Sequence, residues 1–403
     1  MQPHYGALGF LEAQGENDIL FELVFGFIGV FVGWLIVTTI KKPQTKNEIN
    51  FSVSLSMCIS GTLVILKEIA EFFIDFFTGS NLLKADFVED DHWLYRLLGF
   101  GMSPYEQRPL LDTDEDMLLS LLSTLLTTAM LYLYLRLKNK ALYIKAEATK
   151  VPFILKEKIR DKIALEKEKL RNDCSVADTL LWWCTRALMA YAFVVMENRA
   201  EANLLLANFV GTFAITIIHF IFPSESFFSK ISYRTQSLIT VIVFLGSYCG
   251  NYVMMYNILP RFDLFLHFIS GTLCVLGGYY ITLTLIRAES KRNVLLISLF
   301  AFCFSCLVMP AWEISEFIGD FIWGTSNQGF YWGPADSSFF FVLFGRGAYN
   351  TALYPLFDTF YDVLLAFSTT IPTAVVLYIY LSVRLYKKKI NENQPAKKSL
   401  TVG

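Results

Sequence analysis

Apolar residues occur along this chain in nine long stretches separated by short polar segments. Each stretch has about the length that a helix needs to cross a bilayer, roughly 20 residues. The stretches are 18–40, 50–78, 112–137, 176–197, 202–222, 235–257, 263–287, 294–323 and 357–385. The pattern predicts an all-α, polytopic integral membrane protein with about nine transmembrane helices.

Composition supports this class. Hydrophobic residues make up 54% of the 403 residues and charged residues only 17%, which is typical of a multispanning membrane protein. The net charge of -2 gives no basis for predicting a nucleic-acid partner. Most of the seven cysteines lie inside apolar stretches, so they do not form a loop-borne disulfide framework or a close Cys/His zinc cluster. They are interpreted as small core residues.

Basic residues predict the orientation in the membrane. The segments rich in Lys and Arg all fall on one side if the apolar stretches alternate in direction, and the largest of them is 138–171. The positive-inside rule assigns this side to the cytoplasm. The prediction is a multi-pass plasma membrane protein in contact with membrane lipids, with its amino terminus outside and its carboxyl terminus in the cytoplasm. No cleavable signal is expected, because the first apolar stretch has full length and follows an acidic head.

An acidic pattern occurs twice in the chain. Carboxylates in the first three apolar stretches recur in the last three, 245 positions later in the first two stretches of each set and 246 positions later in the third. Carboxylates inside apolar segments are costly, so a function is the default hypothesis for them. The corresponding pairs are Asp18 and Asp263, Glu22 and His267, Lys67 and Trp312, Glu68 and Glu313, Glu71 and Glu316, Asp75 and Asp320, Asp112 and Asp358, and Asp116 and Asp362.

This duplication predicts the organisation of the chain. Both repeats begin on the same side of the membrane, so they are expected to be parallel rather than inverted copies. The predicted parts are a first three-helix repeat (1–137), a charged cytoplasmic amphipathic linker (138–175), three central transmembrane helices (176–262), a second three-helix repeat (263–386) and a cytoplasmic tail (387–403). The linker either lies on anionic lipid at the inner leaflet or is a solvated connecting helix.

The second repeat is predicted to form an acidic pocket that opens to the outside. Within each of its three helices, the carboxylates and the histidine are spaced three or four residues apart. They therefore share one face of that helix, near its outer end. Repulsion and desolvation then require compensation by a divalent cation, bound protons or buried basic residues. Oxygen ligands with one nitrogen suit Mg, Ca or Mn, or Zn where the histidine takes part. The candidate ligands are Asp263, His267, Glu313, Glu316, Asp320, Asp358 and Asp362.

The first repeat offers the same frame with two changes. Glu22 stands in place of His267, and Lys67 stands in place of Trp312. The first copy is therefore predicted to be either a metal site with a different preference or a degenerate, structural site. Its candidate ligands are Asp18, Glu22, Glu68, Glu71, Asp75, Asp112 and Asp116.

Two isolated polar residues lie in the central stretches. Arg186 falls near the middle of the fourth stretch and is predicted to pair with a carboxylate or a lipid phosphate, chiefly for structure. His219, near the inner end of the fifth stretch, is interpreted as a histidine with its hydrogen bonds satisfied.

Three short motifs carry a family resemblance. They are Asp263-x-x-x-His267-x-x-x-Gly271, Trp312-Glu313-x-x-Glu316 and Asp358-Thr359-x-x-Asp362. Together they resemble the YjdF-type inner membrane protein family over the carboxyl-terminal half, and the Asp-to-His element is also similar to VanZ-like proteins. The resemblance implies a polytopic membrane protein with no assigned reaction. The extra amino-terminal unit departs from the family pattern, because it lacks the histidine and the tryptophan.

Three functions remain open from the sequence. The first is metal-dependent hydrolysis or transfer on an amphiphilic or lipid-linked phosphate. In this scheme Asp320 and Asp362 only orient the other residues, which bind the metal or act as general base. The second is a transporter or channel for a divalent or proton-coupled cation, with the acidic pockets as entry sites. The third is a binding or assembly protein that is stabilised by metal. In the first scheme, the residues that bind the metal or act as general base are Asp263, His267, Glu313, Glu316 and Asp358.

Overall fold

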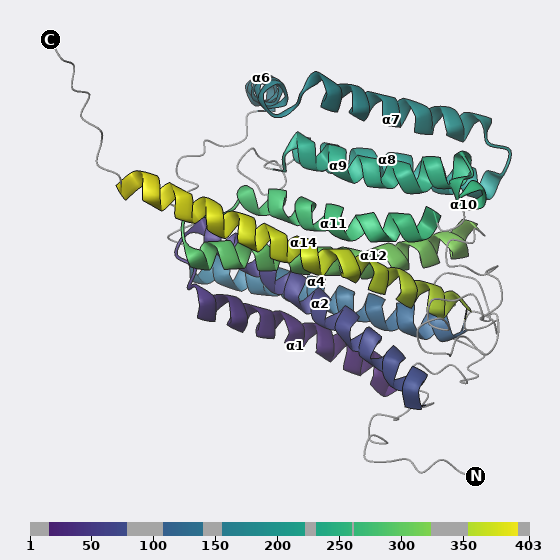
Figure 1. Ribbon diagram of the computed structural model, residues 1–403, viewed down its shortest axis with the longest axis horizontal. Helices are drawn as coiled ribbons and strands as arrows, with labels where there is room; N and C mark the ends of the chain where they lie inside the picture. Colours follow the sequence, from purple (N-terminus) through teal and green to yellow (C-terminus); the bar gives the residue numbers. More distant parts are fainter. Residues whose placement is uncertain are drawn as a thin grey trace.

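Helices are the regular elements of this protein wherever its structure is described. The computed structural model describes residues 16–78, 108–139, 155–221, 231–259, 262–323 and 354–393, and these residues contain helices and no strand (Figure 1). The prediction of an all-α class is confirmed for this part of the chain. The elements are α1 (Glu16–Ile40), α2 (Lys46–Thr78), α4 (Arg108–Lys138), α6 (Leu155–Asp173), α7 (Val176–Val195), α8 (Arg199–Ile221), α9 (Tyr233–Phe244), the π-helix η3 (Leu245–Tyr252), α10 (Met255–Ile258), α11 (Phe262–Leu283), α12 (Lys291–Trp323) and α14 (Tyr354–Asn393).

Seven of the described helices are long and apolar enough to cross a membrane. They are α1, α2, α4, α8, α11, α12 and α14. The other two predicted spans fall short of this criterion. The stretch 176–197 forms α7, which has 20 residues and carries Asp178 and Arg186. The stretch 235–257 is divided into the 12-residue α9, η3 and α10, with a break at Met254.

The helices pack as three groups. Helices α1, α2 and α4 form the first trio, α11, α12 and α14 form the second trio, and α7, α8, α9 and η3 form the central group. Helices α2 and α12 join the two trios, and α11 contacts α9, η3 and α10. In Figure 1 the long helices lie side by side, and α6 is seen nearly end-on at the opposite end of the bundle from α10. The second trio therefore lies between the first trio and the central group.

Apolar side chains fill the space between the two trios. Phe51 of α2 and Phe300 of α12 are both buried, with ring centroids 5.6 Å apart. Leu377 and Leu381 of α14 belong to the same core. Lipid chains are as apolar as these side chains, so close packing and hydrogen bonds, rather than escape from water, favour this association.

Corresponding hydrogen bonds hold each trio together. In the first trio, the Ser60 hydroxyl of α2 donates to the Gly26 carbonyl of α1 (3.1 Å) and lies 2.8 Å from the Thr124 hydroxyl of α4. One buried serine thus links three helices. The second trio has the same arrangement, at 3.2 and 2.9 Å, with Ser305, Gly271 and Thr370.

Glycine is required where these helices approach most closely. A Cβ at Gly271 of α11 would overlap the Ala366 carbonyl oxygen of α14, and a Cβ at Gly26 would overlap the Ser120 carbonyl oxygen of α4. The overlapping atoms belong to the backbone, so no change of rotamer can relieve them. Small residues at such crossings are typical of membrane helices.

Substitution of Gly271 by Ala should destabilise the second trio. Overpacking of this kind costs about 1–3 kcal/mol, which is measurable as a lower unfolding temperature of the full chain in detergent. Gly277→Ala is the matched control on the same helix, because the nearest atom to an added Cβ, Cε1 of Phe304, lies 3.9 Å away. Equal unfolding temperatures for the two variants would contradict the proposed close crossing.

Helix α6 is docked by one buried carboxylate. Glu166 accepts hydrogen bonds from Lys169 (2.8 Å) and from the Tyr233 hydroxyl (2.9 Å), and it lies 2.7 Å from Nε2 of His219. The predicted hydrogen bonding of His219 is therefore confirmed at Nε2, whereas Nδ1 is buried without a hydrogen-bond partner in the described part of the chain. Helix α6 is therefore attached to the ends of α8 and α9, which neither interpretation of the charged linker anticipated.

The environment of Glu166 makes this docking depend on pH. Burial raises the pKa of Glu166, but the hydrogen bonds from Lys169, His219 and Tyr233 outweigh burial, so the pKa lies below its ordinary value of 4.5. A carboxyl group with a lowered pKa stabilises the docked state at pH values above its ordinary pKa. This stabilisation is lost as the pH falls through the lowered pKa.

Glu166→Gln should loosen α6 at neutral pH. Hydrogen bonds to a charged group contribute about 1.5–3 kcal/mol, so amide exchange in α6 should accelerate in the variant. The native protein should exchange faster as the pH falls through the lowered pKa of Glu166, and the variant should lose this acid dependence. Glu168→Gln, at an exposed position of the same helix, is the control and should exchange like the native protein.

Candidate metal centre

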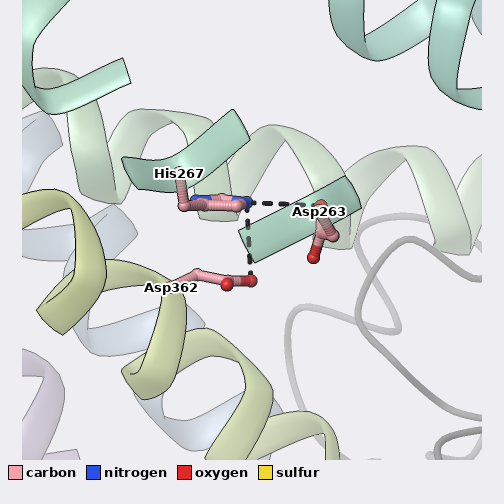
Figure 2. Close-up of side chains that lie close together, drawn as sticks. All are labelled: Asp263, His267 and Asp362. Atoms are coloured by element: carbon pink, nitrogen blue, oxygen red, sulfur yellow. Dashed lines mark ion pairs between the residues drawn. The ribbon is translucent and has the colours of Figure 1, made fainter. Parts of the chain in front are cut away.

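His267 lies where the three helices of the second trio converge. It is buried on α11, and its Nε2 lies 3.6 Å from Oδ1 of Asp263 and 3.4 Å from Oδ2 of Asp362 on α14 (Figure 2). Its Nδ1 lies 3.9 Å from Oε1 of Glu313 on α12. Carboxylate oxygens therefore lie near both nitrogens of the imidazole.

Two overlapping sets of side chains bring potential metal ligands together. Asp263, His267 and Asp362 form one set, and His267, Glu313 and Glu316 form the other. One ligand atom from each member lies within 4.8 Å of the others in its set. Carboxylate oxygens with one imidazole are suitable ligands for Mg, Ca, Mn or Zn.

Two buried carboxylate oxygens of the second trio could be satisfied by a cation. Oδ1 of Asp358 and Oδ1 of Asp362 are buried and have no hydrogen-bond partner within the described residues. Both side chains are more than nine-tenths buried. A buried carboxylate oxygen without a partner carries a large desolvation cost, which a bound cation would offset.

Helix α12 supplies one carboxylate with a fixed partner. The Trp312 indole donates a hydrogen bond to Oε1 of Glu316 at 2.7 Å, one helical turn along α12. The same indole lies against Gly246 of η3, since a Cβ added there would be 3.8 Å from the Trp312 ring. Trp312 therefore connects the acidic cluster to the central group.

In the first trio, an ammonium group occupies the acidic cluster. Nζ of Lys67 lies 2.6 Å from Glu22, 3.0 Å from Glu68, 3.2 Å from Glu71 and 3.2 Å from Asp116. The ligand atoms of Glu22, Glu68 and Asp116 also lie within 4.8 Å of one another. These three side chains are at the positions that correspond to His267, Glu313 and Asp362. Side chains at the same three positions therefore converge in both trios. In the first trio the Lys67 ammonium supplies a positive charge among them.

Other predicted ligands stand apart from these sets. Asp320 and Asp358 are buried on α12 and α14, and Asp358 interacts electrostatically with Asp263 and Asp320. Asp75 is partly buried on α2. None of the three belongs to a described ligand set. The side chains of Asp18 and Asp112 lie outside the described part of the chain.

The structure adds carboxylates that the repeated pattern did not indicate. Asp114 of α4 is fully buried, and neither of its oxygens has a hydrogen-bond partner within the described residues. It interacts electrostatically with Glu68 and Asp320, so it lies between the two trios. Its counterpart in the second trio is Phe360, and for this reason a search for repeated acids misses it. Its position inside an apolar helix was the available signal.

Arg186 does not have the predicted carboxylate partner within the described residues. Its guanidinium donates to the Thr212 carbonyl (2.8 Å) and the Thr240 hydroxyl (3.1 Å). It also lies 3.7 Å from the centroid of Trp182 and 4.8 Å from that of Phe213. Cation–π contacts and a carbonyl dipole therefore stabilise this buried charge, and they join α7 to α8 and α9.

Fold and buried acids together define a polytopic helical membrane protein with an acidic cluster in each trio. The chain belongs to the DUF2238 family of predicted membrane proteins, whose family model matches residues 179–383. This match confirms the resemblance to the YjdF-type family in the carboxyl-terminal half, and it covers the central group and most of the second trio. The VanZ-like similarity is not shown. Neither the curated proteins nor the solved structures contain a match to this chain.

Removal of the Lys67 ammonium should destabilise the first trio. Breaking a buried ion pair by removing one partner costs about 3–5 kcal/mol, so Lys67→Met should lower the unfolding temperature strongly. Addition of Mn²⁺ should restore more stability to this variant than to the native protein, because Glu22, Glu68 and Asp116 would then surround a free cation position. The exposed Lys42 provides the control Lys42→Met. An unchanged unfolding temperature for Lys67→Met would show that the ammonium does not balance the cluster.

Proposed function

We propose that the second trio binds a divalent cation, Mg, Ca, Mn or Zn, and that the protein uses it for hydrolysis or transfer on an amphiphilic or lipid-linked phosphate. The observation that carries this proposal is a difference between the trios: the first has Lys67 where the second has Trp312. The first trio holds its own ammonium among its carboxylates. In the second trio the corresponding side chain is an uncharged indole, so the same position is available to a cation from solution.

Charge balance supports this assignment. Within the described residues, the ion pairs of Asp263 and Asp362 are with His267 alone, and Asp358 has none. A neutral imidazole cannot balance several carboxylates. Divalent cations do so and tolerate mixed oxygen and nitrogen ligands. Bound protons and purely structural hydrogen bonds are the competing explanations, and elemental analysis separates them from a metal.

The proposed roles follow from the geometry. Asp263, His267, Glu313 and Glu316 hold the cation, which would supply an activated water and polarise a phosphoryl oxygen. Asp358 has an unpaired buried oxygen, and this suits a general base. In this scheme Asp320 and Asp362 orient the other groups.

The orientation in the membrane is part of the proposal. The two trios are parallel copies of one unit, and the matching hydrogen bonds of Ser60 and Ser305 support this. Helix α6 and the carboxyl-terminal end of α14, which are both rich in lysine, lie at the same end of the bundle (Figure 1). The positive-inside rule places this end in the cytoplasm and the acidic clusters at the outer leaflet of the plasma membrane.

Cation transport is the second candidate function. Polar side chains extend along α8, where Asn208 donates to Ser247 (2.6 Å) and Thr216 donates to Gln236 (2.8 Å). These contacts place polar groups between α8 and the segment formed by α9 and η3. The guanidinium of Arg186 lies between them on the same face, and a fixed positive charge opposes the passage of cations. Transport therefore ranks second, and a metal that only locks the helices together ranks third.

Elemental analysis of the purified full chain tests the metal. The native protein should bind the cation stoichiometrically, and Asp362→Asn should bind it at least 10-fold more weakly, because the carboxylate charge that orients His267 is lost. Glu289→Gln, in an exposed segment between α11 and α12, is the control. A native protein without bound metal, after supplementation with each of the four cations, would falsify the proposal.

Two further assays identify the use of the metal. Metal-dependent release of phosphate from a lipid phosphate in micelles, abolished by Asp362→Asn, would select the enzyme. Flux of Mn²⁺ into proteoliposomes, abolished by the same change, would select transport. A bound metal without either activity, together with lower stability on chelation, would select the assembly role.

A further inference from the structure

An irregular segment of the central group faces the second trio. The helix that begins as α9 continues as the π-helix η3, ends before Met254 and resumes as α10. Single π-helical turns are rare and frequently occur at functional sites. Met254 has φ 61°, the one positive φ of a residue other than glycine among the described residues. Such a conformation is costly unless surrounding contacts maintain it.

This segment fixes the side chain of Tyr256. A Cβ at Gly250 of η3 would lie 2.6 Å from Cζ of Tyr256, so only glycine leaves room for the ring. On another side, the ring of Phe262 packs edge-on against Tyr256, with centroids 5.5 Å apart. The tyrosine ring is therefore held between η3 and the start of α11.

The hydroxyl of Tyr256 lies near the Trp312 ring. A Cβ added at Gly246 of η3 would be 3.9 Å from the Tyr256 hydroxyl and 3.8 Å from the ring of Trp312, whose indole donates to Glu316 of the acidic cluster. Within the described residues the structure shows no hydrogen bond from the Tyr256 hydroxyl. A phenol is the natural donor at such a place, because it offers a proton without adding charge.

We propose that Tyr256 is a ligand-binding residue of the metal centre, where its hydroxyl donates a hydrogen bond to the oxygen that completes the coordination of the cation. This oxygen belongs to water in the substrate-free protein and to the phosphate when substrate is bound. The inference rests on the proposed function. It gives the segment a role, because the contacts of Gly250 and Phe262 with the ring hold the donor in place before the ligand arrives.

The arrangement of the chain supports this role. Helix α11, which carries Asp263 and His267, contacts α9, η3 and α10. The unpaired buried oxygens of Asp358 and Asp362 indicate independently that the cluster accepts a ligand. The family model matches residues 179–383, which include both Tyr256 and the cluster but exclude the first trio. The tyrosine and the cluster thus belong to the unit that defines the family.

The test uses the full chain in detergent with Mn²⁺ alone as the probe. Tyr256→Phe keeps the ring and removes only the donor. It should bind the native stoichiometry of Mn²⁺ with about 3- to 10-fold lower affinity, the effect expected for one hydrogen bond. Tyr252→Phe is the matched control on η3, since Tyr252 packs against Tyr248 and Tyr191 rather than the cluster. Native affinity in Tyr256→Phe overturns the inference.

A second variant tests the placement of the ring. Gly250→Ala should displace the Tyr256 ring and lower the Mn²⁺ affinity by a similar factor, whereas in the double variant with Tyr256→Phe the two effects should not add. Gly211→Ala is the control, because no atom lies within 4 Å of a Cβ added there. Full additivity in the double variant contradicts a shared mechanism.

The outcomes separate the two proposals. If the native protein binds no Mn²⁺, nor any of the other three cations, the metal centre and the role of Tyr256 both fail. If the native protein binds Mn²⁺ and Tyr256→Phe binds it equally well, the metal centre stands and only the role of Tyr256 is wrong.

Discussion

The structure depends on the balance of buried negative charge. Carboxylates that lie away from water need counter-charges or hydrogen bonds, and both trios gather several of them at one place. In the first trio the ammonium of Lys67 lies within 3.2 Å of four carboxylates. In the second trio the indole of Trp312 satisfies Glu316 alone. The difference between Lys67 and Trp312 at corresponding positions therefore leaves the second cluster without the ammonium that pairs with the carboxylates of the first.

The central group contacts the second trio at Trp312, the position that corresponds to Lys67 of the first trio. Trp312 contacts η3 on one side and Glu316 on the other, so its position in the second trio forms an interface. Helix α10 adds Tyr256, whose hydroxyl and the Trp312 ring both lie within 4 Å of a Cβ added at Gly246. The charged Arg186 of the central group is enclosed by aromatic rings and carbonyl groups, which stabilises α7 against α8 and α9. The acidic cluster of the second trio is thus adjacent to the central group.

Several features of the site were predictable from residue spacing. Asp263 and His267 lie four residues apart on one helix, and the structure places both beside Asp362. The position of Lys67 next to Glu68 also indicated neutralisation of the first copy. Asp114 and Tyr256 were not predictable in this way, because neither is repeated between the copies. The docking of α6 through Glu166 required knowledge of which helix ends lie together, and the break at Met254 does not show in hydropathy.

The sequence by itself determined the class of protein, the helical segments and the two acidic sets. Hydropathy and helical spacing are local properties, so they can be read from neighbouring residues alone. Only the tertiary structure decided which carboxylates share a counter-ion and which retain unpaired oxygens, as Asp358 and Asp362 do. It also decided that Gly250 admits the ring of Tyr256. These outcomes depend on distances of 3–4 Å between residues far apart in the chain, and no local pattern specifies such distances.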